Sequence, residues 1–277
     1  MIPQRNLSRL SNRLAEGGGR RIPESVLERD YCLAWFLAAL GRSTLGKRVT
    51  FKGGTALKRC YFGDYRFSED LDFTLLEDAS FDAILAELVP VFAEVQRASG
   101  IVFRFMRRDD QSHKNSHTFY LGFEGPLPGA APREVKVDIT IREQLVFPLD
   151  QRVVVKGYEE YEDLPDNAVV QVYSLNEIMA EKIVALGDRA RNEPRDLYDA
   201  WYLADGHVVV EELVPAIASK LAFRGKKLGE IGAELKKKEA RLEKLWSTRL
   251  SAQMVTRPEF EGVFRSVQRV LRAAGLE

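Results

Sequence analysis

The sequence predicts an α+β fold, with an N-terminal domain of strands and helices over residues 1–165 and a helical domain over residues 166–277. Apolar and polar side chains alternate strictly over residues 134–141, which is typical of a strand with one buried face. Apolar residues recur at helical spacing over residues 80–98, directly before two further alternating segments. After residue 170 the pattern becomes helical. Strands mixed with helices, followed by helices alone, indicate this division.

Local signals predict the elements of the first domain. Apolar residues at helical spacing predict a helix over residues 3–16, and the glycine run that follows ends it. Pro23 begins a longer helix that ends at Gly41. A glycine turn then leads from the first strand into a short helix over residues 55–61. The expected strands are residues 49–51, 70–76, 101–107, 117–124 and 134–141.

The helical domain is expected to begin with a capping box. Ser174 is a good N-cap residue, and Glu177 stands three positions later, where its carboxylate can reach back to the cap. The predicted helix runs to about Arg189, and a second helix begins after Pro194 and continues through Leu203. The remaining residues also have helical patterns.

Composition limits the classes of function. The chain has 277 residues with 41 basic and 41 acidic side chains, so its zero net charge argues neither for nor against a nucleic-acid partner. Cys32 and Cys60 lie in apolar helical contexts and are expected to be reduced core thiols. No apolar run approaches the roughly 20 residues of a membrane span, and the N-terminal segment has no apolar signal core. We therefore expect a cytoplasmic protein with no membrane partner.

The segment FKGGTALKRCYF contains a candidate phosphate-binding turn. Gly53 and Gly54 lead from a strand into a helix that starts at Thr55. The first N–H groups of a helix are unpaired and bind phosphate, and the Thr55 hydroxyl can add a further hydrogen bond. The alternative is a strand-to-helix turn that needs glycine only for its backbone dihedrals.

Three carboxylates form the second constellation. Asp70 and Asp72 are two residues apart, so in a strand both side chains lie on one face. Asp138 lies in the strand over residues 134–141, which is expected to pair beside them. Together they suit two Mg²⁺ ions, with Mn²⁺ as an alternative, in the arrangement used for phosphoryl transfer. Asp70 and Asp72 taken alone could equally be solvent-facing residues of an edge strand.

Several flanking side chains are candidates for the same site. Lys52, Arg66 and Ser68 lie next to the two motifs and are predicted to contact the nucleotide, and Lys136 shares a face with Asp138. A second group lies further along the chain, over residues 224–249, where Lys and Arg alternate with Glu. This stretch predicts a solvated helix face, and the alternative is a surface that contacts RNA phosphates.

Lys182 stands on an otherwise apolar helix and either extends to the helix edge or points into a polar cleft. Lys182, Arg189 and Asp196 meet if the two helices around them form an antiparallel pair. A cation there can offset triphosphate charge in the transition state. The alternative is a structural salt bridge from Asp196 to Lys182 or Arg189 that holds the two helices together.

Four motifs carry a resemblance to a known family: FKGGTALKRCYF, RFSEDLDF, KVDI and SLNEIMAEKIVAL…RNEPRDLYDAWYL, in this order over about residues 50–205. They resemble the AbiEii/AbiGii-type nucleotidyltransferase toxins, which include the mycobacterial MenT proteins and belong to the polymerase-β-like nucleotidyltransferase superfamily. Thr55 stands where the superfamily usually has Ser, which preserves the hydroxyl. The resemblance implies a mixed sheet flanked by helices, with the helical domain completing a cleft for nucleotide and acceptor.

The resemblance also implies roles for single residues. Gly53, Gly54 and Thr55 match the phosphate-binding motif, Asp70 and Asp72 the metal pair, and Asp138 the third carboxylate. Lys182 matches a lysine that contacts the nucleotide phosphates. The RDLYD segment holds a functional aspartate of the family, for which Asp196 is preferred over Asp199.

These implications add up to a Mg²⁺-dependent nucleotidyltransferase toxin. It is expected to transfer a nucleoside monophosphate from an NTP to RNA, in particular to a tRNA 3′ end, and so to block translation, with a cognate antitoxin as partner. The alternatives are transfer to a small molecule such as an antibiotic, and a nucleotide- or RNA-binding module without turnover.

Overall fold

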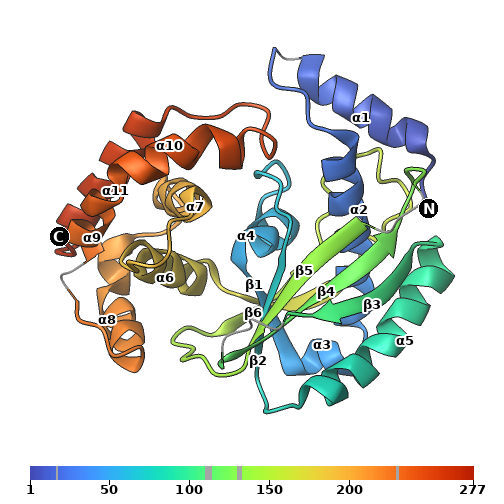
Figure 1. Cartoon of the computed structure of the whole chain (residues 1–277), viewed down its shortest axis with the longest axis horizontal. Coiled ribbons are helices and arrows are strands. Elements are labelled where there is room, and N and C mark those ends of the chain that lie inside the picture. Colours follow the sequence, from blue (N-terminus) through green and yellow to red (C-terminus); the bar gives the residue numbers. More distant parts are fainter. Residues whose placement is uncertain (17, 110–113, 130–132, 229–230) are drawn as a thin grey trace. The chain divides into compact units, whose positions relative to one another are not determined.

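The computed structural model describes residues 1–277 except residues 17, 110–113, 130–132 and 229–230 (Figure 1). The chain separates into two compact units. The first comprises Met1–Glu143, Leu149–Val172 and Gln253–Val255, and the second comprises Gln144–Pro148, Tyr173–Ala252 and Thr256–Glu277. Each unit has its own core and is described by itself.

The first unit is built on a mixed seven-stranded sheet in the order β3-β4-β5-β2-β1-β7-β6. Strand β2 pairs antiparallel with β1 and parallel with β5, while β1 also pairs parallel with β7. The mixed sheet with flanking helices confirms the predicted α+β class. The strands are β1 (Val49–Lys52), β2 (Leu71–Leu75), β3 (Val102–Arg108), β4 (Ser116–Glu124), β5 (Arg133–Thr140), β6 (Leu149–Val153) and β7 (Val169–Tyr173).

Helices α2 (Glu24–Gly41) and α5 (Phe81–Ser99) pack against each other and carry much of the core of this unit. Phe36 of α2 lies 5.4 Å, between ring centroids, from Phe103 of β3. Phe81 of α5 lies 5.6 Å from Phe119 of β4 in an edge-to-face contact. Along β4 every second residue therefore faces this core, while β3 has a register shift between Phe105 and Arg107 that interrupts the alternation. Helices α1 (Gln4–Glu16) and α3 (Thr44–Arg48) complete the unit.

The glycine motif opens a short composite helix between β1 and β2. Helix α4 (Gly53–Ala56) continues without interruption into a π-helical turn, η1 (Leu57–Tyr61). The sequence predicts helix only from Thr55, two residues late, because the helix begins on the glycines themselves. Residues 62–70 then lead to β2, so Asp70 lies just before the strand rather than inside it.

The second unit is helical, as predicted, and begins at α6 (Leu175–Leu186). The Ser174 hydroxyl accepts a hydrogen bond from the Glu177 N–H, which confirms the predicted N-cap. The Glu177 carboxylate does not complete a capping box with Ser174: it accepts hydrogen bonds from the N–H groups of Val146 and Phe147. Helix α6 ends before the predicted Arg189. The other helices are α7 (Pro194–Ala204), η2 (Val210–Leu213), α8 (Val214–Phe223), α9 (Ile231–Lys237), α10 (Glu239–Leu250) and α11 (Phe260–Ala273).

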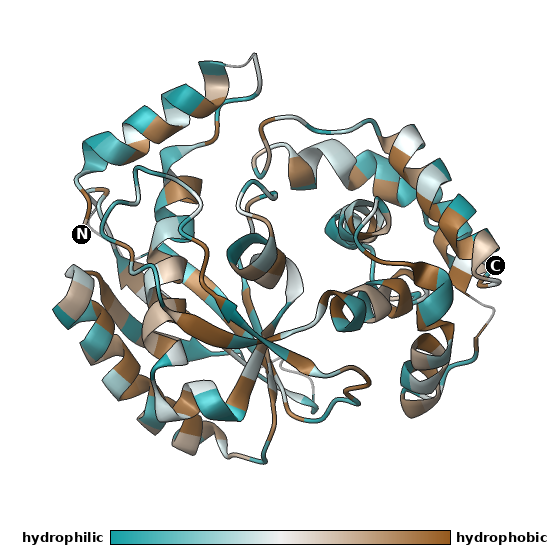
Figure 2. Ribbon diagram, turned by 180° about the vertical axis from the view of Figure 1, so that it is seen from behind, coloured by the Kyte–Doolittle hydropathy of each residue, from teal (hydrophilic) through white to brown (hydrophobic). Residues whose placement is uncertain are grey.

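Helix α11 shows how this unit buries its apolar surface. Hydrophobic and hydrophilic bands alternate along it (Figure 2). Its buried residues recur at three- and four-residue spacing, from Phe260 through Phe264 and Val267 to Leu271. In the described part of the chain no helix is both long and apolar enough to cross a membrane. Both cysteines are buried and unbonded, in agreement with the sequence.

Candidate active site

Strand register brings three charged side chains into one row on the sheet. Lys52 of β1 lies opposite Asp72 of β2, and Asp72 lies beside Asp138 of β5. Paired residues on neighbouring strands project to the same face, about 5 Å apart. The pairing of β2 with β5 confirms the expected pairing of the two carboxylate strands. All three side chains are partly exposed.

The Lys52 ammonium group spans this row. Its Nζ donates to the Thr140 hydroxyl at 3.1 Å. Thr140 lies on β5, two residues beyond Asp138, so the lysine side chain crosses β2 to reach it. A positive charge is therefore held on the same face as Asp72 and Asp138. This position suits both neutralisation of the carboxylates and binding of phosphate.

The turn at Gly53 touches the carboxylate pair directly. Gly53 has φ +79°, a conformation that L side chains rarely adopt. A Cβ atom at this position would lie 2.5 Å from Oδ2 of Asp72. Glycine is therefore required twice over, by the backbone dihedral and by the approach of Asp72. The two motifs that the sequence places 17 residues apart form one structure.

Gly54 is required for a second close approach. A Cβ atom there would lie 2.4 Å from Nη2 of Arg66 and 3.2 Å from the Ser68 hydroxyl. The Arg66 side chain is buried, and its Nη1 donates to the carbonyl of Phe67 and to Oε1 of Gln253, each at 3.2 Å. Arg66 and Ser68 thus lie against the glycine turn, as expected for residues of the same site.

Thr55 has a different role from the one its sequence position suggests. Its side chain is buried, and its hydroxyl donates to the backbone carbonyl of Asp70. Because the hydroxyl proton is used in this hydrogen bond, Thr55 in this conformation links the start of the helix to the residue just before β2. The contact positions Asp70 through its backbone.

The donor set of this site fits a hard divalent cation, since carboxylate oxygens are the ligands that Mg²⁺ prefers. Asp72 and Asp138 are neighbours in register, and Asp70 is anchored just before the same strand. Within the residues that the structure describes, no three or more His, Cys, Asp or Glu side chains gather so as to hold a metal ion. Magnesium binding by Asp70, Asp72 and Asp138 therefore stays a prediction.

The second unit contains a buried ion cluster around Lys182. Its Nζ lies 2.7 Å from Oδ1 of Asp196 and 2.7 Å from Oδ2 of Asp199, so both aspartates of the RDLYD segment contact the lysine. Arg191 also pairs with Asp196. Burial would raise the pKa of Asp196, but Lys182 and Arg191 outweigh it and hold this pKa well below its usual value. The sequence places Arg189 in this cluster if the two helices form an antiparallel pair; in the structure Arg189 pairs with Glu234 at 3.0 Å.

Several of the basic residues after residue 223 are engaged within the same unit. Lys226 pairs with Asp188 at 2.9 Å, although no acid adjoins it in sequence. Lys237 pairs with Glu234 at 2.7 Å. Lys238 is buried, not solvated, and its Nζ donates to the carbonyls of Leu186, Asp188 and Arg191 at 2.5, 3.0 and 3.1 Å. The stretch therefore offers less unpaired positive charge than its sequence suggests.

A buried polar cluster behind the glycine helix was not found from the sequence. Arg59 pairs with Asp30 of α2, and the Tyr161 hydroxyl donates to the same carboxylate at 3.2 Å. Lys58 is also buried, and its Nζ donates to the Gly63 carbonyl at 2.6 Å and to the Tyr158 hydroxyl at 2.9 Å. The available signal was two consecutive cations, Lys58 and Arg59, on an otherwise apolar helix, and the acid Asp30 just before the long apolar run of α2.

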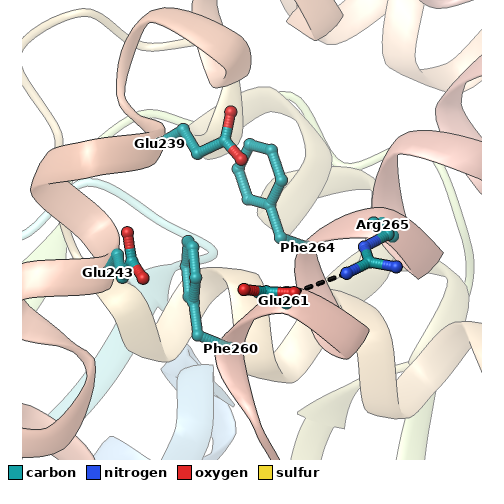
Figure 3. Close-up of a pocket in the computed structure, with 6 residues that line it drawn as sticks. All are labelled: Glu239, Glu243, Phe260, Glu261, Phe264 and Arg265. Atoms are coloured by element: carbon teal, nitrogen blue, oxygen red, sulfur yellow. Dashed lines mark hydrogen bonds and ion pairs between the residues drawn. The ribbon is translucent and has the colours of Figure 1, made fainter.

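A hollow of about 240 Å³ lies between α10 and α11 in the second unit (Figure 3). Glu239, Glu243, Phe260 and Phe264 line it, together with Glu261, which pairs with Arg265. Glutamates repel phosphate, so this hollow does not suit a nucleotide.

Comparisons with known proteins agree with the geometry. The family model described as nucleotidyl transferase AbiEii toxin, type IV TA system, matches residues 35–273. Among solved structures, the chain is similar in fold to MenT4, a nucleotidyltransferase toxin from Mycobacterium tuberculosis H37Rv, with a TM-score of 0.62 and 20% sequence identity over 95% of this chain and 87% of that chain. No curated protein matches the sequence.

Proposed function

Because the chain belongs to the AbiEii family of nucleotidyltransferase toxins of type IV toxin–antitoxin systems, we propose that it transfers a nucleoside monophosphate from an NTP to the 3′ end of a tRNA. The observation that carries the proposal is the row of Lys52, Asp72 and Asp138 beside the glycine turn. A carboxylate pair next to a turn that admits only glycine is suited to a metal-bound triphosphate.

In the proposed reaction the acceptor hydroxyl attacks the α-phosphorus of the NTP and pyrophosphate leaves. Asp72 and Asp138, with Asp70, would hold Mg²⁺, which neutralises phosphate charge and increases the acidity of the attacking hydroxyl. The turn at Gly53 and Gly54 leaves room for phosphate oxygens close to the backbone. Lys52 adds positive charge on the same face. Positioning and charge neutralisation supply most of the catalysis in reactions of this class.

The roles of three further residues stay predictions. Arg66 and Ser68 lie against the turn and would order it, so that its N–H groups keep their direction. Lys182 is assigned to the triphosphate by the family resemblance alone. Its contacts with Asp196 and Asp199 match the structural alternative, in which the ion pair holds α6 and α7 together.

The experiment that tests the function is incubation of the protein with labelled NTPs, Mg²⁺ and total tRNA. We expect label in tRNA, and we expect the substitution Asp72→Asn to abolish it because the amide is a poor ligand for Mg²⁺. Asp166→Asn, which removes the charge of an exposed aspartate, is the matched control and should transfer normally. Full transfer by Asp72→Asn would refute the metal assignment.

The same assay separates the alternatives. Label in small molecules of a cell extract, with none in RNA, would favour a small-molecule acceptor. Nucleotide binding without transfer to any acceptor would favour a binding module. If tRNA is the acceptor, expression of the wild type should stop growth in the absence of the antitoxin, and expression of Asp72→Asn should not.

A further inference from the structure

We propose that single-stranded RNA lies across the face of the sheet beside the carboxylate pair, with a base stacked on Arg107 and Tyr120 and a phosphate contacted by Lys136. The proposal rests on the proposed function for the identity of the acceptor. It assigns the acceptor to Arg107 of β3 and Tyr120 of β4, which no motif marks, and to Lys136 of β5, which begins the KVDI motif.

The register of three strands defines this surface. Lys136 precedes Asp138 by two residues on β5 and therefore shares its face. Tyr120 of β4 pairs with Lys136, and Arg107 of β3 pairs with Tyr120. Lys136, Tyr120 and Arg107 thus form a second row, parallel to the row of Lys52, Asp72 and Asp138. We call this second row the stacking row.

The core lies on the other side of the strands. Phe119, next to Tyr120 on β4, faces α5, and Phe103 of β3 faces α2. An irregularity of the β-bulge type between Phe105 and Arg107 shifts the register of β3, so that Arg107 pairs with Tyr120 and lies on the face away from this core. The side chain of Arg107 is 53% exposed, and Lys136 and Tyr120 are partly exposed. These three side chains are therefore accessible to a ligand and do not belong to the hydrophobic core.

The contact between Arg107 and Tyr120 has the chemistry of a base-stacking platform. The guanidinium carbon lies 3.6 Å from the centroid of the Tyr120 ring, so the two planar groups are in direct contact. Arginine planes and tyrosine rings are the side chains on which unpaired RNA bases stack. A base placed against either group extends a stack that already exists. Because every base has a π face, such a platform tolerates different sequences.

Lys136 and Arg107 can meet the phosphates of an RNA strand, beside two carboxylates at this surface: Glu134, which pairs with Arg107, and Asp109, which accepts a hydrogen bond from the Tyr120 hydroxyl at 3.5 Å. Among the described residues, Lys136 has no carboxylate partner within ion-pair distance. Arg107 pairs with Glu134 at 2.9 Å, but both side chains are substantially exposed, at 53% and 37%. An ion pair of this kind contributes little stability and exchanges readily for a phosphate.

The distances suit one acceptor that reaches from the stacking row to the carboxylates. Strand spacings place Lys136 about 7 Å from Asp138 along β5, and Arg107 about 12 Å from Asp138 across the sheet. A nucleotide near the 3′ end can therefore stack on Arg107 while the terminal hydroxyl lies at Asp138. A small acceptor such as an antibiotic does not need this second row.

The test is binding of a fluorescently labelled single-stranded RNA oligonucleotide, measured by anisotropy without NTP, with NTP binding measured separately by calorimetry. Arg107→Gln and Tyr120→Leu should each weaken RNA binding about tenfold, because loss of one stacking contact has an effect of this size. Arg97→Gln is the matched control, since Arg97 is an exposed arginine on α5 with one ion pair, to Glu94 at 2.8 Å. It should bind RNA like the wild type.

Lys136→Met separates the phosphate contact from the stack. It should lower the slope of log binding constant against log salt concentration by about 0.7, as expected when one phosphate contact to a single strand is lost. Arg107→Gln, Tyr120→Leu and Arg97→Gln should bind NTP normally, which shows that the fold is intact, and the fold of Lys136→Met is checked by its Tm. RNA binding by Arg107→Gln, Tyr120→Leu and Lys136→Met equal to that of Arg97→Gln would overturn the proposal.

Two results distinguish this proposal from the proposed function. If the wild type binds RNA through the stacking row but transfers no nucleotide to it, the stacking row stands and the transferase assignment fails. If the wild type labels tRNA and the stacking-row variants keep wild-type RNA affinity and KM, the transferase assignment stands and the stacking row fails. Where Tyr120→Leu also loses NTP binding, Lys136→Met decides, because it leaves the Arg107–Tyr120 contact in place.

Discussion

The close approach of Asp72 to the turn at Gly53 gives the sharpest prediction. Gly53→Ala places a methyl group 2.5 Å from Oδ2 of Asp72, at a residue whose φ is +79°. Real Cβ atoms almost never come closer than 3.0 Å to a heavy atom of a residue that is not adjacent in the chain. The carboxylate of Asp72 or the turn itself must therefore move by about half an ångström or more. The substitution disturbs the carboxylate pair without removing any of its oxygens.

Two effects of this substitution have different sizes and different readouts. An alanine in the left-handed region costs about 1–2 kcal/mol of stability, which lowers Tm by several degrees in a chain of this size. Displacement of a metal-binding oxygen affects catalysis, and misplacement by about 1 Å can cost roughly a hundredfold in rate. We expect Gly53→Ala to reduce nucleotide transfer about 10- to 100-fold.

Gly206→Ala is the control that separates the two effects. Gly206 has φ +85°, and a Cβ atom there has no neighbour within 4 Å. It should lower Tm by a similar amount but leave the transfer rate of the folded protein unchanged. The assay is transfer of labelled nucleotide to tRNA at a temperature well below both Tm values. Wild-type transfer by Gly53→Ala, or an equal loss in Gly206→Ala, would refute the reasoning.

Two further predictions concern buried lysines. Lys182→Met removes the cation that lies 2.7 Å from the fully buried Asp199, so urea unfolding should show a loss of about 3–5 kcal/mol. Lys244→Met, on an exposed face of α10, should change the free energy of unfolding little, and equal effects would contradict the structural role of the cluster. Burial lowers the pKa of Lys58 from 10.5 to about 8. Between pH 8 and 10.5 the unfolded chain therefore binds more protons than the folded chain. The free energy of unfolding of the wild type should rise with pH in this window relative to that of Lys58→Met. Parallel pH profiles for the two proteins would contradict this assignment.

The sequence was sufficient for the elements whose signals are local. Strict alternation identified β5, and the two-residue spacing of the DLD motif placed Asp72 on one face of β2. Strand β7 was not predicted, because it is short and is held by a parallel pairing with β1 that joins residues over 100 positions apart, such as Phe51 and Val172. Strand β6 was also not predicted, because its residues are largely exposed and lack a clear apolar face.

Side-chain partners were harder to predict than elements. Helix α6 ends at Leu186, and the turn after it changes the direction of the chain, so Arg191 and not Arg189 meets Asp196. The hydroxyl of Thr55 was expected to face phosphate, but its donor bond to the carbonyl of Asp70 depends on how residues 62–70 return to the helix. Both outcomes are decided by loop paths, which periodicity does not encode.

The charges of the Lys182 cluster limit what this lysine can contribute to nucleotide binding. Lys182 and Arg191 face Asp196 and Asp199, so the four formal charges cancel within the cluster. The lowered pKa of Asp196 keeps its carboxylate ionised at neutral pH, so the cancellation persists under working conditions. Carboxylates that pair this closely with Lys182 reduce the attraction between this lysine and a triphosphate. Lys52, whose ammonium group lies on the face of Asp72 and Asp138 and donates to the Thr140 hydroxyl, is a second candidate source of positive charge for the reacting phosphates.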